Sequence, residues 1–134
     1  MEKTFRVEIY TPLGKYLSTD ADFLRVTSKV SVLGILPNHA PLVTSLEICR
    51  LTIKMNSKEF HYAISGGVMN IKKDHSVVLL VNSIESSDEI DVKRALEAKK
   101  RAEERIAAHD DEVDISRAKA ALSRALNRLS ISKE

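Results

Sequence analysis

The basic side chains of the C-terminal third recur at spacings that could gather them around one anion. At about 100° per helical residue, Asp91, Arg94 and Arg101 fall within roughly 80° of one another on one helix. A second set of arginines spans about 40° on a following helix and consists of Arg117, Arg124 and Arg128. The planar guanidinium group binds phosphate oxygens through two parallel hydrogen bonds. The spacing therefore predicts an arginine-lined flank suited to a phosphate-bearing ligand.

Two helices must position these arginines. Residues 85–128 contain two basic, alanine-rich helical runs, which are separated by the acidic turn at 109–114. Helices joined by so short a connection lie antiparallel, so both sets of arginines can converge on one ligand. We expect a C-terminal antiparallel two-helix hairpin.

The ends and the facing stripes of these helices can also be predicted. We expect Ser87 or Asp88 to cap the first helix, with Asp91 in its first turn, and Asp114 to cap the second. The facing stripes are made of small and apolar residues, namely Ala95, Ala98, Ala102 and Ile106 on the first helix and Ile115, Ala118, Leu122, Ala125, Leu126 and Leu129 on the second. Alanine buries little area, and burial contributes only about 25 cal/mol per Å², so we expect a marginally stable hairpin that can move.

Two other interpretations of the basic hairpin remain open. Its charges could be ordinary solvated faces, because Glu97, Glu103 and Glu104 can pair with neighbouring lysines and arginines. The second helix argues against this, since residues 117–128 contain four cations and no acid. The hairpin could also be a mobile basic arm that binds an acidic protein surface, which is compatible with phosphate binding if it has two states.

The chain before residue 85 has a strand pattern. Apolar and polar residues alternate from Phe5 onward, Thr11–Gly14 supplies a hairpin turn, and short β-rich segments follow up to about Ser83. The pair Gly66–Gly67 is expected to form a tight turn or a bulge. We predict an α+β protein in which residues 1–84 form an antiparallel β-sandwich of about ten strands and residues 85–134 form the helical hairpin.

Composition and motifs argue against several functions. The 21 basic and 19 acidic residues nearly cancel, so bulk charge does not predict binding to nucleic acid or membranes. No stretch approaches the roughly 20 apolar residues of a membrane span, and the lone Cys49 is expected to be a buried thiol. The histidines lack metal-ligand spacing, and no phosphate-binding loop or nucleophile motif is present. An independent enzyme is the least favoured hypothesis.

Three segments together resemble one known family. The run Gly34–Thr44 (GILPNHAPLVT), the run Ser65–Val68 (SGGV) and the terminal alanine-rich hairpin are similar to the epsilon subunit of bacterial F-type ATP synthase, and the similarity covers essentially the whole chain. The resemblance implies a non-catalytic subunit at the cytoplasmic face of the cell membrane, bound peripherally through the gamma subunit and the c-ring. It also implies a hairpin that either folds on the sandwich or extends to the beta subunits and blocks ATP hydrolysis.

The resemblance further implies a ligand for the arginines. Residues 90–95 match the Ile/Leu-Asp-x-x-Arg-Ala pattern of family members that bind ATP on the folded hairpin. By position, the implied ATP-binding residues are Glu85, Ile90, Asp91, Arg94, Ala95, Arg101, Arg124 and Arg128. The arginines would bind the phosphates. Glu85 and Asp91 would orient the arginines or accept hydrogen bonds from adenine or ribose. Ile90 and Ala95 would lie near the base. ATP would act as a regulatory ligand and not as a catalytic cofactor, with its Mg²⁺ dependence open.

Two competing hypotheses remain. In one, the same rotor subunit has a hairpin that does not bind ATP appreciably. In the other, the hairpin is a nucleic-acid-binding arm, which the 4% aromatic content and the acidic turn disfavour.

The sequence also departs from the family pattern in one loop. Ser31–Leu33 stands where an acidic residue and a glycine are usual, and Asn38 replaces a glycine. Asparagine tolerates a left-handed backbone, so we expect the turn to survive. By position, His39 and Thr44 are the implied contacts with the gamma subunit.

Overall fold

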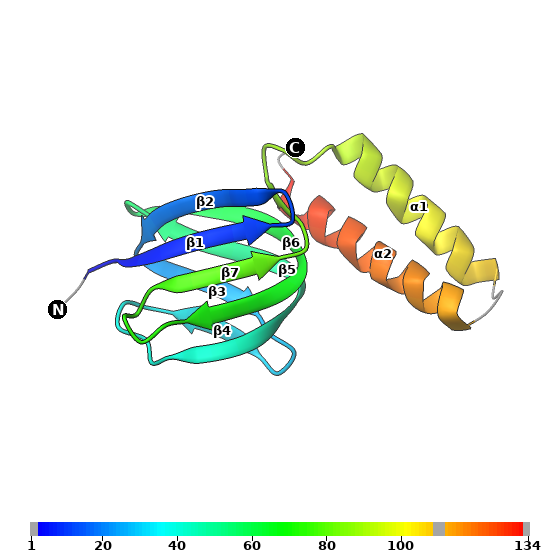
Figure 1. Ribbon diagram of the computed structural model, residues 1–134. Helices are drawn as coiled ribbons and strands as arrows, with labels where there is room; N and C mark the ends of the chain where they lie inside the picture. The colour runs from blue at the N-terminus through cyan, green and yellow to red at the C-terminus, as the bar shows by residue number, and fades with distance from the viewer. Residues whose placement is uncertain (1–2, 109–111, 133–134) are drawn as a thin grey trace.

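The computed structural model describes residues 3–108 and 112–132. A β-sheet domain forms the N-terminal part, and a two-helix hairpin projects from one end of it (Figure 1). The predicted α+β class is therefore confirmed. Neither described helix is both long enough and apolar enough to cross a bilayer.

Eight strands occur in the described residues, compared with the expected number of about ten. They are β1 (Phe5–Thr11), β2 (Gly14–Ala21), β3 (Phe23–Thr27), β4 (Val32–Ile35), β5 (Leu42–Met55), β6 (Lys58–Ile71), β7 (Val77–Val81) and β8 (Ile84–Ser86). The strand order is β2-β1-β7-β6-β5-β3-β4, and β8 also pairs with β6. Every pairing is antiparallel except that of β1 with β7. The sheet folds over so that its strands form two facing layers (Figure 1).

The core lies between these layers and follows from the alternation in the sequence. Val7 and Ile9 of β1 are completely buried, whereas Arg6 before Val7 is exposed and Glu8 between them is half-buried. The same alternation continues in β3, where Leu24 and Val26 are completely buried. The predicted hairpin of β1 and β2 is confirmed.

The glycine pair forms neither the expected turn nor a bulge. Gly66 and Gly67 lie inside β6, at φ angles of +100° and +150°. The first half of β6 pairs with β8 and the second half with β7, and both pairings keep one register. A Cβ atom on Gly67 would lie 2.1 Å from the carbonyl oxygen of Leu80. Glycine is therefore needed here because the neighbouring backbone comes too close for any side chain.

The helices are α1 (Val92–Ala108) and α2 (Glu112–Ile131). The predicted caps were wrong. Asp91 caps α1, because its Oδ1 atom accepts from the main-chain nitrogen of Arg94 at 3.1 Å. Residues 84–86 form β8 and residues 87–89 form a turn, in which the nitrogen of Glu89 donates to the oxygen of Ser86, so the helix begins only at Val92. On the second helix, α2 begins two residues before the expected cap Asp114.

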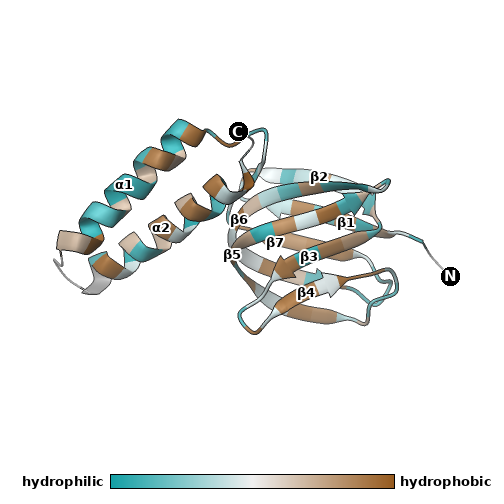
Figure 2. Cartoon of the chain, turned by 180° about the vertical axis from the view of Figure 1, so that it is seen from behind, coloured by the Kyte–Doolittle hydropathy of each residue, from teal (hydrophilic) through white to brown (hydrophobic). Residues whose placement is uncertain are grey.

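Alanines form the seam between the helices. Ala95 and Ala102 of α1 and Ala118 and Ala125 of α2 are all at most 3% exposed. Leu126 was wrongly assigned to the seam, because it is 46% exposed beside Ala125. Helix α2 packs against β5 and β6, whereas α1 packs on α2 and lies farther from the sandwich (Figure 2).

Candidate anion pocket between the hairpin and the sandwich

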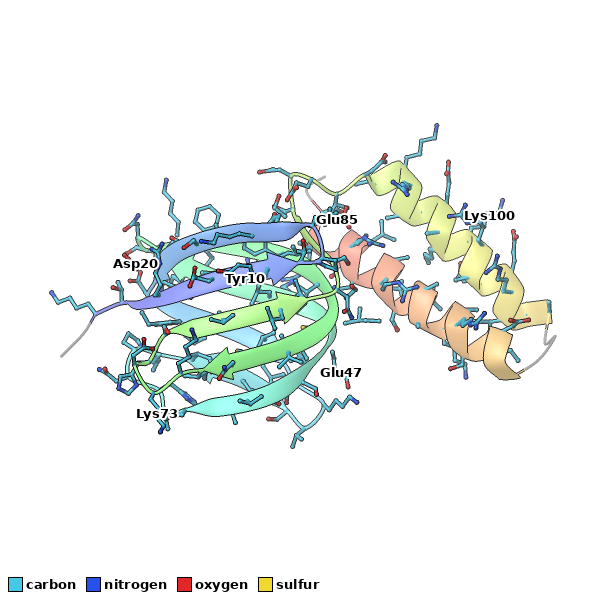
Figure 3. The ribbon with its side chains drawn as sticks, viewed as in Figure 1. Tyr10, Asp20, Glu47, Lys73, Glu85 and Lys100 are labelled. Atoms are coloured by element: carbon cyan, nitrogen blue, oxygen red, sulfur yellow. The ribbon has the colours of Figure 1, made fainter. Side chains whose placement is uncertain are left out.

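A pocket of about 480 Å³ opens where the end of the sandwich meets both helices. Its lining residues are Ser83, Glu85, Glu89, Asp91, Arg94, Ala95, Ala98, Arg101, Ala121, Arg124 and Arg128. Glu85 lies at this junction of the sandwich and the hairpin (Figure 3). The fold therefore brings together seven of the eight residues that were predicted from sequence.

The eighth residue, Ile90, does not line the pocket. Its side chain is only 8% exposed and packs with Ala63 and Ile131 beneath the linker. The sequence pattern placed Ile90 beside Asp91 but did not predict its burial. The burial arises because the linker turns the side chain of Ile90 towards the sandwich. Ile90 therefore holds the hairpin against the sandwich.

Each carboxylate of the pocket already has a protein donor. Arg128 donates through Nε to Oε1 of Glu85. Glu89 accepts from the hydroxyl of Tyr16 and from the main-chain nitrogen of Ser86, the latter at 2.9 Å. Asp91 is occupied as the cap of α1. All three acids are held in place, but only Glu85 is paired with a cation, so Glu85 opposes an incoming anion less than a free carboxylate would.

The remaining arginines have no such partners. Among the residues that the structure describes, no side-chain hydrogen bond or ion pair engages Arg94, Arg101 or Arg124. Three guanidinium groups from two helices thus line one pocket without a direct ion pair in the described chain. This arrangement can bind a ligand with several anionic oxygens, since arginine forms charge-assisted bonds to phosphate.

Sequence reasoning missed four lining residues. Ala98 and Ala121 lie one turn from Ala95 and Ala125 on the facing stripes, so helical spacing could have placed them in the lining. No sequence signal marks the other two, Ser83 and Glu89. Ser83 lies just before β8 and Glu89 just after it, so both flank the strand that leads from the sandwich into the linker.

The environment of Glu89 shifts two pKa values in opposite directions. Hydrogen bonds from Tyr16 and from the Ser86 main chain lower the pKa of Glu89 below its ordinary value. Burial, followed by the bond to Glu89, raises the pKa of Tyr16 well above its ordinary value. Both shifts favour a neutral tyrosine that donates to an ionised carboxylate.

The two residues implied to contact the gamma subunit lie on the sandwich, away from this pocket. Asn38 has the expected left-handed backbone, with φ at +68°. The main-chain oxygen of the next residue, His39, accepts from Nδ1 of His75 at 3.1 Å. Thr44 is half-buried in β5, beside the 68% exposed Val43.

An exposed apolar row, which sequence reasoning missed, lies on the outer face of these strands. It consists of Val43 on β5, Val68 on β6 and Leu80 on β7, and we call it the outer apolar row. Val68 lies directly opposite Leu80 and Ser45, and Val43 lies two residues before Ser45 on the same face of β5. The three side chains are therefore neighbours on adjacent strands, with Val43 diagonal to Val68. Single exposed apolar residues are common, but a row across three strands indicates a contact surface.

Comparison with known proteins agrees with this architecture. Residues 4–87 match the β-sandwich domain of the ATP synthase delta/epsilon chain, and residues 88–133 match the long alpha-helix domain of the same class. The chain belongs to the ATP synthase epsilon chain family. As an epsilon chain it is a non-catalytic subunit and not an enzyme in itself.

Several bacterial relatives share this assignment. An ATP synthase epsilon chain from Pelotomaculum thermopropionicum is 46% identical over 106 residues, covering 79% of this chain and 78% of the relative. One from Bacillus licheniformis is 41% identical over 131 residues, covering 98% and 99%. A chain in the Euglena gracilis mitochondrial ATP synthase superposes with a TM-score of 0.85 at 18% identity, covering 97% of this chain and 81% of that one. At such low identity, this last likeness supports the fold alone.

Proposed function

We propose that the protein is a central-stalk subunit of a bacterial F-type ATP synthase whose hairpin binds ATP when it is folded. The sandwich would couple the gamma subunit to the c-ring at the cytoplasmic face of the membrane. The hairpin would inhibit ATP hydrolysis when it extends towards the beta subunits. One observation supports the ATP-binding part most directly: Arg94, Arg101 and Arg124 line one pocket without partners in the described chain.

The chemistry of the pocket favours a nucleoside triphosphate. Three unpaired arginines match the many anionic oxygens of a phosphate chain better than they match the two oxygens of a single carboxylate. Ala95, Ala98 and Ala121 supply an apolar wall on which a base can lie. A volume of about 480 Å³ is within the range of small-ligand sites.

The hairpin has the features of a two-state element. Its seam is made of alanines, so little apolar area holds α1 to α2. ATP would bind the folded state selectively, and it would stabilise that state by about 2.7 kcal/mol at a hundredfold excess over its Kd. When ATP is scarce, the arginines of the hairpin would be free to bind acidic surfaces of the beta subunits.

The outer apolar row supports docking to the rotor. Val43, Val68 and Leu80 are 68%, 40% and 55% exposed, and they lie on strands whose other faces form the core. A partner helix could cover this row, as in other interfaces with an apolar centre. We assign the row to the gamma subunit, with His39 and Thr44 near its margin.

Isothermal titration calorimetry on the full chain tests ATP binding. The Arg124→Ala variant should bind ATP at least tenfold more weakly than the wild type, because it loses a charge-assisted hydrogen bond worth about 1.5–3 kcal/mol. The Arg117→Ala variant is the matched control, because Arg117 is an exposed arginine of the same helix that does not line the pocket. Equal affinity in the wild type and the Arg124→Ala variant would contradict the proposed site. Titrations with and without Mg²⁺ determine whether the ion is required.

The competing hypothesis is a rotor subunit that does not bind ATP. It predicts no heat of binding for the wild type at millimolar ATP. A nucleic-acid-binding arm would instead show a salt-dependent affinity for DNA or RNA.

A further inference from the structure

A tyrosine of the sandwich reaches the linker that leads into the hairpin. Tyr16 lies on β2, at the edge of the sheet, and its hydroxyl donates to Oε1 of Glu89, 73 residues later in the chain. Glu89 also lines the anion pocket. The Tyr16–Glu89 bond therefore connects the sandwich directly to the wall of the candidate site.

A strand irregularity positions Tyr16 for this contact. In the pairing of β1 with β2, Ile9 lies opposite Leu17 but Tyr10 lies opposite Lys15, so Tyr16 is the extra residue at the register shift. Such bulges re-aim a side chain and bend the strand locally. The ring of Tyr16 also packs edge-on against that of Tyr62, with centroids 6.1 Å apart.

The same carboxylate organises the linker. Oε1 of Glu89 accepts from the main-chain nitrogen of Ser86 at 2.9 Å, and the nitrogen of Glu89 donates to the oxygen of Ser86 at 3.0 Å. The main-chain nitrogen of Ser87, the residue after Ser86, donates to the oxygen of His61 on β6 at 3.3 Å. The linker is thus bound to both β2 and β6 as far as Glu89. Two residues later, Asp91 caps α1.

We propose that Tyr16 is a positioning residue, which ties the linker to the edge of the sandwich through Glu89 and so fixes where the movable hairpin begins. Chain motion that releases α1 would then start at Ile90 and Asp91. While the bond holds, Glu89 and the cap of α1 keep Arg94 at the pocket. The link to ATP rests on the proposed function, but the tie to the linker does not.

Hydrogen exchange of the full chain without nucleotide tests the tie. Tyr16→Phe removes only the hydroxyl, and it should speed exchange at the amides of Ser86, Ser87 and Glu89 about threefold to tenfold. Tyr10→Phe is the matched control, because Tyr10 also donates to a glutamate, Glu8, at 3.1 Å, but lies outside the linker and the pocket. Unchanged exchange at the three amides in Tyr16→Phe would overturn the proposal.

A double-mutant cycle tests the positioning role. Tyr16→Phe should weaken ATP binding about threefold to tenfold in the wild-type background, and it should cause no further loss in a Glu89→Ala background, because the contact is already broken there. Additive losses, or full affinity in Tyr16→Phe, would overturn positioning through Glu89. A wild-type chain that does not bind ATP would contradict the proposed function alone, since exchange without nucleotide still decides the tie. Circular dichroism melts show whether each variant is folded. If Tyr16→Phe is unfolded, Glu89→Ala, which removes the acceptor, carries the exchange test at the amide of Ser87.

Discussion

The side-chain amide of Asn127 on α2 donates a hydrogen bond of 2.7 Å to the main-chain oxygen of Cys49 on β5. One turn further on, the oxygen of Ser130 accepts from Arg50 of the same strand at 2.8 Å. The second helix is therefore fastened to the sandwich by polar contacts to backbone oxygens as well as by apolar packing. These contacts lie outside the arginine set that would bind a nucleotide.

The first prediction concerns this fastening. Asn127→Ala should weaken docking of α2 by about 1 kcal/mol, because it leaves the oxygen of Cys49 without this donor. Exchange of the amides near the end of α2 should then be about fivefold faster. Ser123→Ala is the control, since Ser123 is an exposed residue one turn earlier on the same helix. Equal exchange in both variants would show that Asn127 does not hold the helix.

The sequence predicted those parts of the structure that depend on periodicity. Alternation in β1 and the helical spacing of the arginines report which face a side chain occupies, and they agree with the structure except at one position. Arg117, which the spacing grouped with Arg124 and Arg128, does not line the pocket. The cap at Asp91, the burial of Ile90 and the exposure of Leu126 depend on how the hairpin meets the sandwich. These three features are determined by how segments far apart in the sequence pack together, as in the bond from Tyr16 to Glu89. Local sequence patterns do not predict such contacts.

The second prediction concerns the close approach of β6 and β7. Gly67→Ala should destabilise the sandwich by several kcal/mol, because its Cβ would lie 2.1 Å from the oxygen of Leu80. Gly14→Ala is a useful comparison, because its φ of +118° also disfavours a side chain but nothing lies within 4 Å. It should cost only about 1–2 kcal/mol. Urea unfolding of the two variants measures the difference, and similar losses would contradict the steric account.

The third prediction concerns the alanine seam. Ala125 is completely buried between the helices, whereas the adjacent Leu126 is 46% exposed. Ala125→Leu should force the helices apart at a cost of about 1–3 kcal/mol, and Leu126→Ala should cost less than about 1 kcal/mol. Exchange protection of α1 and α2 measures both effects. Equal protection in the two variants would contradict the close seam.

The fourth prediction concerns alkaline pH. Burial is the main cause that raises the pKa values of Tyr16 and Tyr62 above the ordinary 10.0. The folded chain therefore keeps protons that the unfolded chain releases above pH 10, so stability should fall as the pH rises above that value. Urea unfolding at about pH 8 and about pH 11 should show this loss, and the loss should be smaller in Tyr16→Phe. An identical loss in the variant would contradict a raised pKa of Tyr16.

The central claim is that ATP stabilises the folded hairpin through the pocket arginines. Its most direct test is hydrogen exchange of α1 and α2 in the full chain, with and without ATP at about a hundredfold excess over Kd. We predict that ATP slows exchange of these helices by up to about a hundredfold and that the sandwich core is unaffected. At the same ATP concentration, the effect should be about tenfold smaller or more in Arg94→Ala. Unchanged exchange in both helices, under conditions where calorimetry shows ATP to be bound, would contradict the claim.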